Sequence, residues 1–331
     1  MPVVSIIVPC YNEQDTITLL LDAIYNQSYC RSELEVVISD GLSTDGTRAR
    51  ILEFMQSHQD LSIRIVDNKK RTIPSGLNIA IEAAGGEFVV RLDAHSIPYP
   101  DYVAQCVLAL MQDRGDNVGG VWEINPGASD WIARGIAAAA AHPIAVGDAR
   151  YRLGGAAQAV DTVPFGAYRK ELIQRVGAYD ESLLTNEDYE LNVRIRQAGG
   201  RVWFDPAIRS VYFSRPTLRK LFSQYWRYGF WKSRMIRRYP STLRWRQLLP
   251  PTFILGLLGL GILALWYPVF WWFILAVIAI YLLILIAAGV IMALKKHDGL
   301  LVLGLPLAIS FMHFSWGAAF LWSFLKKPVE R

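Results

Sequence analysis

The chain has 331 residues and a formal net charge of +5, and hydrophobic residues make up 53% of it. Its charge is divided unevenly, because residues 1–205 carry 18 Lys+Arg against 27 Asp+Glu, whereas residues 206–331 carry 16 against 2. No acid occurs from Pro206 to His297. A long basic tract beside apolar segments favours an anionic membrane surface as partner and argues against nucleic acid.

The amino-terminal half is expected to be cytoplasmic. Cys10, Cys30 and Cys106 show neither a C-x-x-C pair nor a zinc spacing, which is typical of reduced cysteines in a cytosolic domain. The first residues, Met1–Pro9, lack the basic n-region of a signal peptide and predict a first strand instead.

Strands and helices alternate over the first 113 residues. We predict strands at Val3–Val8, Glu35–Ser39, Ser62–Asp67 and Phe88–Leu92, and helices at about Asp15–Tyr25, Thr47–Ser57, Ser75–Ala83 and Tyr99–Asp113. This spacing indicates βαβ units and an α/β fold with a mostly parallel sheet. Such a sheet binds a nucleotide across the carboxyl ends of its strands.

The apolar strand at Phe88–Leu92 leads into Asp93-Ala94-His95. A carboxylate and an imidazole just past the carboxyl end of a strand can both bind a divalent cation, and a cation held by one carboxylate usually also holds substrate phosphates. On this motif alone a second interpretation stays open, in which Asp93 caps the following helix and His95 is an ordinary loop histidine.

After Asp113 the alternation loosens. The pattern predicts a strand at Val118–Glu123 and an alanine-rich helix at Trp131–Ala141. The glycine-rich segment Ile144–Val160 is typical of a mobile active-site loop. Further helices are expected at Lys170–Val176 and from Thr185 to Arg196, and short strands at Val202–Phe204 and Ile208–Phe213.

The carboxy-terminal part is apolar or amphipathic. Thr217–Tyr239 predicts a helix with aromatic residues opposite arginines, as in helices that lie in a membrane interface. Leu249–Tyr267 and Val269–Leu294 are long enough to cross a bilayer, and so is Gly299–Leu325. A third crossing would place Lys326-Lys327 outside, against the positive-inside tendency. Either that tendency is overridden, or Gly299–Leu325 is a re-entrant hairpin broken at Pro306.

Five motifs in this order resemble family 2 glycosyltransferases with the GT-A fold, most closely the membrane-associated succinoglycan-biosynthesis branch of the ExoA type. The matching segments are Val4–Glu13, Asp40–Thr47, Arg91–His95, Asn186–Asn192 and Gln224–Tyr228. The resemblance implies a Rossmann-like GT-A catalytic domain over residues 1–214, a basic interfacial segment over 215–248, and a transmembrane region over 249–328 with two or three helices.

The resemblance also implies roles for individual residues. Pro9, Tyr11 and Glu13 would line the nucleoside pocket, Asp40 would bind the uracil or ribose, and Asp93 would hold Mg²⁺ or Mn²⁺ on the diphosphate. His95 stands where the family has a second acid. Asp188, in the pair Glu187-Asp188, matches the catalytic base. Gln224, Arg227 and Tyr228 resemble the Q-x-x-R-W motif for diphosphate and acceptor, with Tyr228 where the family has Trp. Arg71, which follows the third strand, is added as a nucleotide-binding candidate, and Asp161 as a candidate for acceptor or diphosphate.

These roles predict an inverting, metal-dependent transfer of one sugar from a UDP-sugar to a lipid-linked saccharide, on the cytoplasmic face of a bacterial inner membrane during exopolysaccharide assembly. The transfer needs a cation on the departing diphosphate and a base at the acceptor hydroxyl. From the residues alone, Thr185-x-x-Asp188 also fits a helix capping box. A polyprenyl-phosphate glycosyltransferase, a processive synthase and a non-catalytic membrane scaffold stay open as alternatives.

Overall fold

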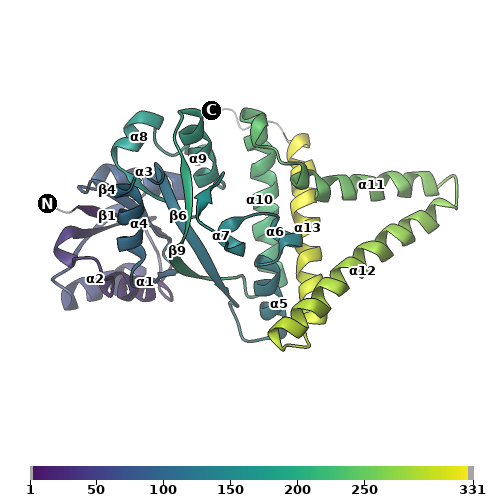
Figure 1. The fold of residues 1–331 in the computed structure, drawn as a ribbon, viewed down its shortest axis with the longest axis horizontal. Helices are drawn as coiled ribbons and strands as arrows, with labels where there is room; N and C mark the ends of the chain where they lie inside the picture. Colours follow the sequence, from purple (N-terminus) through teal and green to yellow (C-terminus); the bar gives the residue numbers. More distant parts are fainter. Residues whose placement is uncertain (1–2, 327–331) are drawn as a thin grey trace. The chain divides into compact units, whose positions relative to one another are not determined.

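The computed structural model describes residues 3–326 of the chain (Figure 1). They form two compact units, one of Met1–Glu123 with Arg150–Tyr212 and one of Ile124–Ala149 with Phe213–Arg331. The segment Ile124–Ala149 therefore groups with the carboxy-terminal helices, although it is inserted within the chain of the first unit. The domain boundary expected at residue 214 would instead assign this segment to the catalytic domain.

The first unit is built on one sheet with the strand order β3-β2-β1-β4-β8-β6-β9-β5. β1 (Val4–Cys10), β2 (Leu34–Asp40), β3 (Ser62–Asp67) and β4 (Phe88–Arg91) are parallel, and Cys10, Asp40 and Asp67 are register partners at their carboxyl ends. The sheet continues antiparallel through β5 (Ser96–Pro98), β6 (Asn117–Asn125), β7 (Gln158–Ala159), β8 (Ala167–Arg169) and β9 (Val202–Phe213).

Helices cover both faces of this sheet, and the alternation of side chains along β1 shows why. Ile6 and Val8 pack into one apolar core with α1 (Ile17–Tyr25), α2 (Thr47–Ser57) and α4 (Tyr102–Met111). Ile7 points the other way, into a second core with α3 (Ile73–Ala83), α8 (Glu171–Val176) and α9 (Glu187–Gln197). The predicted α/β fold with βαβ units is confirmed.

Two local predictions are wrong. The segment Ile144–Val160, expected to be a mobile active-site loop, is not a continuous loop, because it contains most of α6 (Pro143–Val146), then α7 (Arg150–Leu153) and β7. α6 forms because Pro143 stands in its first turn and the His142 side chain accepts the backbone N–H of Ile144. The two short strands expected around Pro206 are one continuous strand, β9.

The second unit is helical. It contains α5 (Trp131–Ala140), α6, α10 (Leu218–Arg238), α11 (Leu249–Ala264), α12 (Phe270–Lys296) and α13 (Leu301–Leu325). Short 3-10 turns stand at Arg31–Glu33 in the first unit and at Pro240–Thr242 and Trp245–Leu248 in the second. Three helices within residues 3–326 are long and apolar enough to cross a membrane. Since α13 runs unbroken through Pro306, the alternative of a re-entrant hairpin broken at that proline is wrong.

Candidate active site

A buried arginine joins two acidic motifs that lie far apart in the sequence. Arg91 ends β4, and its Nη2 atom lies 3.2 Å from Oδ1 of Asp93 and 3.0 Å from Oε1 of Glu187. The exposed fractions of the Arg91 and Glu187 side chains are 4% and 8%, whereas Asp93 keeps 24%. Asp93 is therefore the member of this cluster that a ligand can reach most easily.

The helix α9 positions the acid pair. It begins after Asn186, which adopts a left-handed conformation with φ 68°, and Glu187 and Asp188 fall in its first turn. Asp188 Oδ1 accepts the backbone N–H of Tyr189 at 2.7 Å, while the Thr185 hydroxyl donates to the carbonyl of Leu184. The capping-box interpretation of Thr185 and Asp188 is thus wrong. Asp93 does not cap α4 either, because the residue before that helix is Asp101.

Burial controls the protonation of this cluster. Desolvation raises the pKa of Glu187 to about 7, although the Arg91 guanidinium opposes the shift. Desolvation also raises the pKa of Asp188, again against the field of Arg91. Burial acts against the charge of Arg91, but Asp93 and Glu187 raise the pKa of Arg91 well above its usual range. A raised pKa in a buried carboxyl pair is typical of a group that exchanges a proton at neutral pH.

A second polar contact links the ends of β1 and β4. His95 Nδ1 lies 3.1 Å from Oε1 of Glu13, and the hydroxyl of Thr16 also donates to Glu13. Burial disfavours the ionised carboxyl, but the hydrogen bonds from His95 and Thr16 lower the pKa of Glu13. The structure thus places Glu13 beside the imidazole that follows Asp93.

The predicted nucleoside-binding residues gather at the carboxyl ends of β1, β2 and β3. Tyr11 is 43% exposed, and the Arg71 guanidinium lies 5.8 Å from the centre of its ring. Asp40 is fully buried, its carboxylate accepts a hydrogen bond from the Ser43 hydroxyl, and it forms an ion pair with Arg48, whose Nε lies 2.7 Å from Oδ2. Pro9 is half-buried on β1. Tyr11 and Arg71 are therefore the accessible members of this group, and Asp40 lies below the surface.

Backbone strain gathers around the candidate residues. Of the non-glycine residues with positive φ, Asn12, Leu42, Arg71, Phe165 and Asn186 are themselves candidates or lie within four residues of one. Such conformations cost free energy and persist mostly at functional sites, where the surrounding structure imposes them. This distribution independently marks the same edge of the sheet.

The remaining predicted residues divide between the two units. In the first unit, Asp161 Oδ2 accepts the Tyr189 hydroxyl at 3.0 Å, which brings Asp161 to the helix of the acid pair. In the second unit, Gln224 Nε2 donates to the Tyr228 hydroxyl at 2.9 Å, and Arg227 is exposed on the same helix, α10.

Arg91 is a site residue that the sequence patterns did not predict, although it lies within the matching segment Arg91–His95. The signal that could have revealed it is an arginine in an otherwise apolar strand, because a buried guanidinium requires carboxylate partners.

The donor set fits a divalent cation. Within residues 3–326, no three His, Cys, Asp or Glu side chains converge as a complete metal site. Mg²⁺ and similar ions commonly take one or two protein ligands and complete their coordination with substrate phosphates and water. Asp93 and His95, a carboxylate and an imidazole on one loop, supply such a partial set, and the imidazole suits Mn²⁺ better than Mg²⁺.

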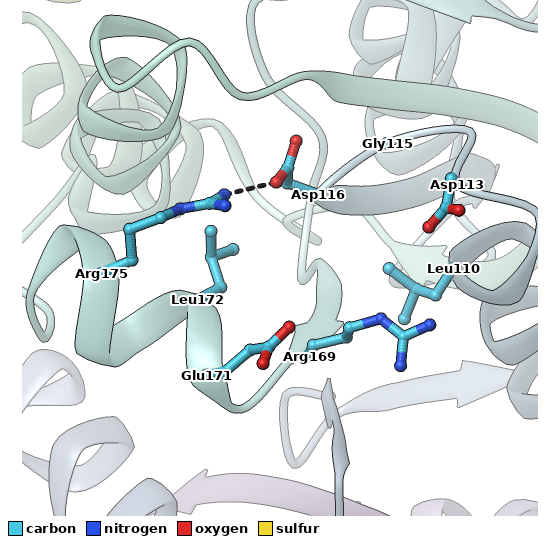
Figure 2. A pocket seen from close by; sticks show the side chains of 8 residues that line it. All are labelled: Leu110, Asp113, Gly115, Asp116, Arg169, Glu171, Leu172 and Arg175. Atoms are coloured by element: carbon cyan, nitrogen blue, oxygen red, sulfur yellow. Dashed lines mark hydrogen bonds and ion pairs between the residues drawn. The ribbon is translucent and has the colours of Figure 1, made fainter.

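A cavity of about 470 Å³ lies elsewhere in the first unit (Figure 2). Arg169 lines it and pairs in register with Phe88, the first residue of β4, so the cavity belongs to the amino end of that strand. Asp116 and Arg175 form an ion pair at its wall. Because the acid cluster stands at the carboxyl end of β4, this cavity is a separate feature.

Comparison with known proteins agrees with this geometry. The family described as Glycosyl transferase family 2 matches residues 5–177. The succinoglycan biosynthesis protein ExoA of Rhizobium meliloti is 30% identical over 319 residues, which cover 95% of this chain and 93% of the relative. A dolichyl N-acetyl-alpha-D-glucosaminyl phosphate 3-beta-D-2,3-diacetamido-2,3-dideoxy-beta-D-glucuronosyltransferase of Methanococcus voltae is 28% identical over 95% of this chain and 94% of its own length.

Solved structures share the fold. The mannosyltransferase PcManGT of Pyrobaculum calidifontis, in complex with GDP-Man and Mn²⁺, superposes with a TM-score of 0.65 at 23% identity, covering 98% of this chain and 87% of its own. S. aureus TarS 1–349 in complex with UDP superposes with a TM-score of 0.51 at 19% identity, covering 70% of this chain and 65% of its own. These likenesses confirm the predicted GT-A-like fold.

Proposed function

Because the chain belongs to glycosyl transferase family 2, we propose that it is an inverting glycosyltransferase that moves one sugar from a nucleotide sugar to a lipid-linked saccharide. The observation that carries this proposal is the cluster in which Arg91 bonds both Asp93 and Glu187, with Asp188 next along the chain. It joins an acid suited to hold a cation on the diphosphate and an acid pair suited to proton transfer, of which Glu187 is buried and Asp188 half-buried.

Asp188 acts as the base in this proposal. Its carboxylate takes the proton of the acceptor hydroxyl while the hydroxyl oxygen attacks the anomeric carbon and the bond to the diphosphate breaks. Attack from the face opposite the leaving group inverts the anomeric centre, so an α-linked donor gives a β-linked product. Glu187, held by Arg91, fixes the first turn of α9 and thereby the direction of Asp188.

The donor occupies the carboxyl edge of the parallel strands. Tyr11 and Arg71 bind the nucleoside, with Pro9 and Asp40 supporting them from β1 and β2. Asp93 and His95 would hold Mg²⁺ or Mn²⁺, which would supply positive charge at the departing diphosphate. A UDP-sugar is the proposed donor, and S. aureus TarS, which shares the fold, has been solved with UDP.

The acceptor is proposed to be a polyprenyl-diphosphate saccharide in exopolysaccharide assembly. The names of the Rhizobium and Methanococcus relatives refer to succinoglycan biosynthesis and to a dolichyl-linked sugar phosphate. The acid-free basic tract and the apolar helices favour a site at the cytoplasmic face of the inner membrane. The proposed acceptor and diphosphate ligands are Asp161 in the first unit and Gln224, Arg227 and Tyr228 of α10 in the second, each proposed from its own motif or position.

The proposal is tested by screening nucleotide sugars with the detergent-purified protein and a polyprenyl-diphosphate saccharide, with and without Mn²⁺. We expect a product one sugar longer, cation dependence, and β-anomeric stereochemistry by NMR from an α-linked donor. An α-linked product, or equal transfer after removal of divalent cations, would contradict the mechanism. Asp60→Asn, which removes an exposed carboxylate paired with Arg31 away from the site, is the matched control for carboxylate substitutions.

A further inference from the structure

α13 differs from the other two apolar helices in how much of it the protein covers. We compare the most apolar 18-residue stretch of each helix. The buried fraction of this stretch is 50% in α13, 17% in α12 and 11% in the segment that includes α11. α13 is also the least apolar of the three. Helices that cross a bilayer alone or in pairs present most of their surface to lipid, as α11 and α12 do.

The helix that covers one side of α13 is α10, and the two run parallel along most of their length (Figure 1). Near their amino ends, Leu221 and Ile309 share one apolar core. In the middle the two backbones lie in close contact, because a Cβ added at Gly229 would stand 2.2 Å from the carbonyl oxygen of Trp316. Near their carboxyl ends, Arg237 donates to the carbonyl of Ser323 at 2.9 Å. α13 therefore lies at the same depth as α10.

The composition of α10 excludes it from the hydrocarbon core. Its 21 residues contain seven arginines and lysines and no acid. Each such charge is energetically costly at the bilayer centre. Arg227, near the middle of α10 and exposed, stands too far from either end to reach a headgroup if the helix crossed the membrane. α10 is instead suited to lie along the interface.

Close backbone and polar contacts cover a further part of α13. α5 crosses it so closely that a Cβ at Gly135 would stand 2.5 Å from the backbone of Gly304. Just before α13, Asp298 bonds Arg134 at 2.8 Å, and within the helix His313 Nε2 lies 3.0 Å from the carbonyl oxygen of Ile144. α13 thus packs against both the amphipathic basic helix α10 and the inserted segment.

From this packing we infer that only the hairpin α11–α12 crosses the bilayer, and that α13 lies beside α10 at the headgroup level of the face from which the hairpin enters. The partner of the exposed hairpin surface is lipid hydrocarbon. Aromatic residues at the hairpin turn, Trp266 and Tyr267, are 67% and 61% exposed and suit the far interface.

The distribution of charge agrees with this arrangement. Arg244 and Arg246 precede α11, Lys295 and Lys296 end α12, and Lys326 follows α13. With α13 at the interface, all of these positions lie on one face of the membrane, so the positive-inside tendency is satisfied at each of them. A third crossing would place Lys326 on the opposite face.

The test is cysteine labelling with a membrane-impermeant maleimide in right-side-out and inverted vesicles, using full-length protein with Cys30→Ser as background. Single cysteines replace Ser223 on α10, Gly299 before α13 and Lys326 after it, all exposed positions. Gly299 accepts a side chain, because no atom lies within 4 Å of its Cβ position. We expect all three to react from the same side.

Reaction of the Gly299 and Lys326 cysteines from opposite sides would overturn the inference. Labelling after detergent addition shows that each thiol is reactive, and retained transfer activity shows that each variant folds. An independent readout in whole cells rests on the proposed cytoplasmic location of the first unit: fluorescent protein fused to the carboxyl terminus should be fluorescent and alkaline phosphatase fused there should be inactive. The reverse pattern would also overturn the inference.

Discussion

The Nη2 atom of Arg91 lies 3.0 Å from Oε1 of Glu187, although 96 residues separate the two in the sequence. This contact joins the strand that presents Asp93 to the helix that presents Asp188. It is buried, so its charge interactions are stronger than they would be at the surface. The donor-binding acid and the proposed base are therefore positioned by one shared side chain.

Replacing Arg91 by Gln should shift the pH dependence of transfer. Burial already raises the pKa of Asp188, and the Arg91 guanidinium opposes that shift. Without the guanidinium the pKa of Asp188 rises further, so the ionised base is lost at a higher pH. We expect the acid limb of the kcat/KM profile to move up by about 1–3 pH units.

Arg91→Lys is the matched control, because it keeps the positive charge but not the planar fork. It should move the acid limb less than Arg91→Gln does, while still lowering kcat. An unchanged acid limb in a folded Arg91→Gln protein, checked by circular dichroism, would contradict the assignment.

Tyr11→Ala should weaken nucleoside diphosphate binding. The exposed ring offers a stacking surface, and stacking of a base on an aromatic side chain is worth about 1–3 kcal/mol. Isothermal titration with UDP should show a higher Kd for Tyr11→Ala and a nearly unchanged Kd for Tyr11→Phe, which retains the ring. Equal affinity for all three proteins would remove Tyr11 from the nucleoside site.

His95→Asn should change which cation supports transfer. The amide oxygen is a harder ligand than imidazole, so activity with Mg²⁺ should rise relative to activity with Mn²⁺. The amide N–H can still donate to Glu13, as the imidazole does at 3.1 Å. Glu13→Gln keeps the imidazole and should leave the cation ratio near that of the wild type. An identical Mg²⁺ to Mn²⁺ ratio in His95→Asn would argue against His95 as a ligand.

Gly135→Ala should destabilise the second unit. Its Cβ would stand 2.5 Å from the backbone of Gly304, and overpacking of this kind costs roughly 1–3 kcal/mol. Gly256→Ala is the control, since no atom lies within 4 Å of that Cβ position. Thermal unfolding in detergent should show a lower Tm for Gly135→Ala alone. Equal Tm values would mean that the α5–α13 crossing is looser than the structure has it.

Local patterns predict the parallel half of the first unit well, since apolar strands such as Val4–Cys10 and amphipathic helices such as Thr47–Ser57 carry their own periodicity. They fail where tertiary contacts decide. The short helix α6 forms after His142 through a side-chain cap, and the packing of α5 on α13 depends on glycines that meet across these two helices. α13 itself has the composition of a membrane span, and only its partners reveal how far it is covered.

In the candidate site, too, local patterns predict some residues and tertiary contacts decide the others. Asp93, Asp188 and Tyr11 come from motifs that the sequence shows directly. The role of Arg91 does not, because its partners Asp93 and Glu187 are two and 96 residues away and only the fold brings them to one guanidinium. The contact between Glu13 and His95 likewise requires the pairing of β1 with β4.

The central claim is that Asp188 removes the proton of the acceptor hydroxyl. The most direct measurement compares Asp188→Asn with the wild type for single-sugar transfer and for UDP affinity in the same preparation. The account predicts a loss of kcat of at least about 10²–10⁴-fold with UDP affinity retained. Normal turnover by Asp188→Asn would contradict it, because the acceptor would then need no base at this position.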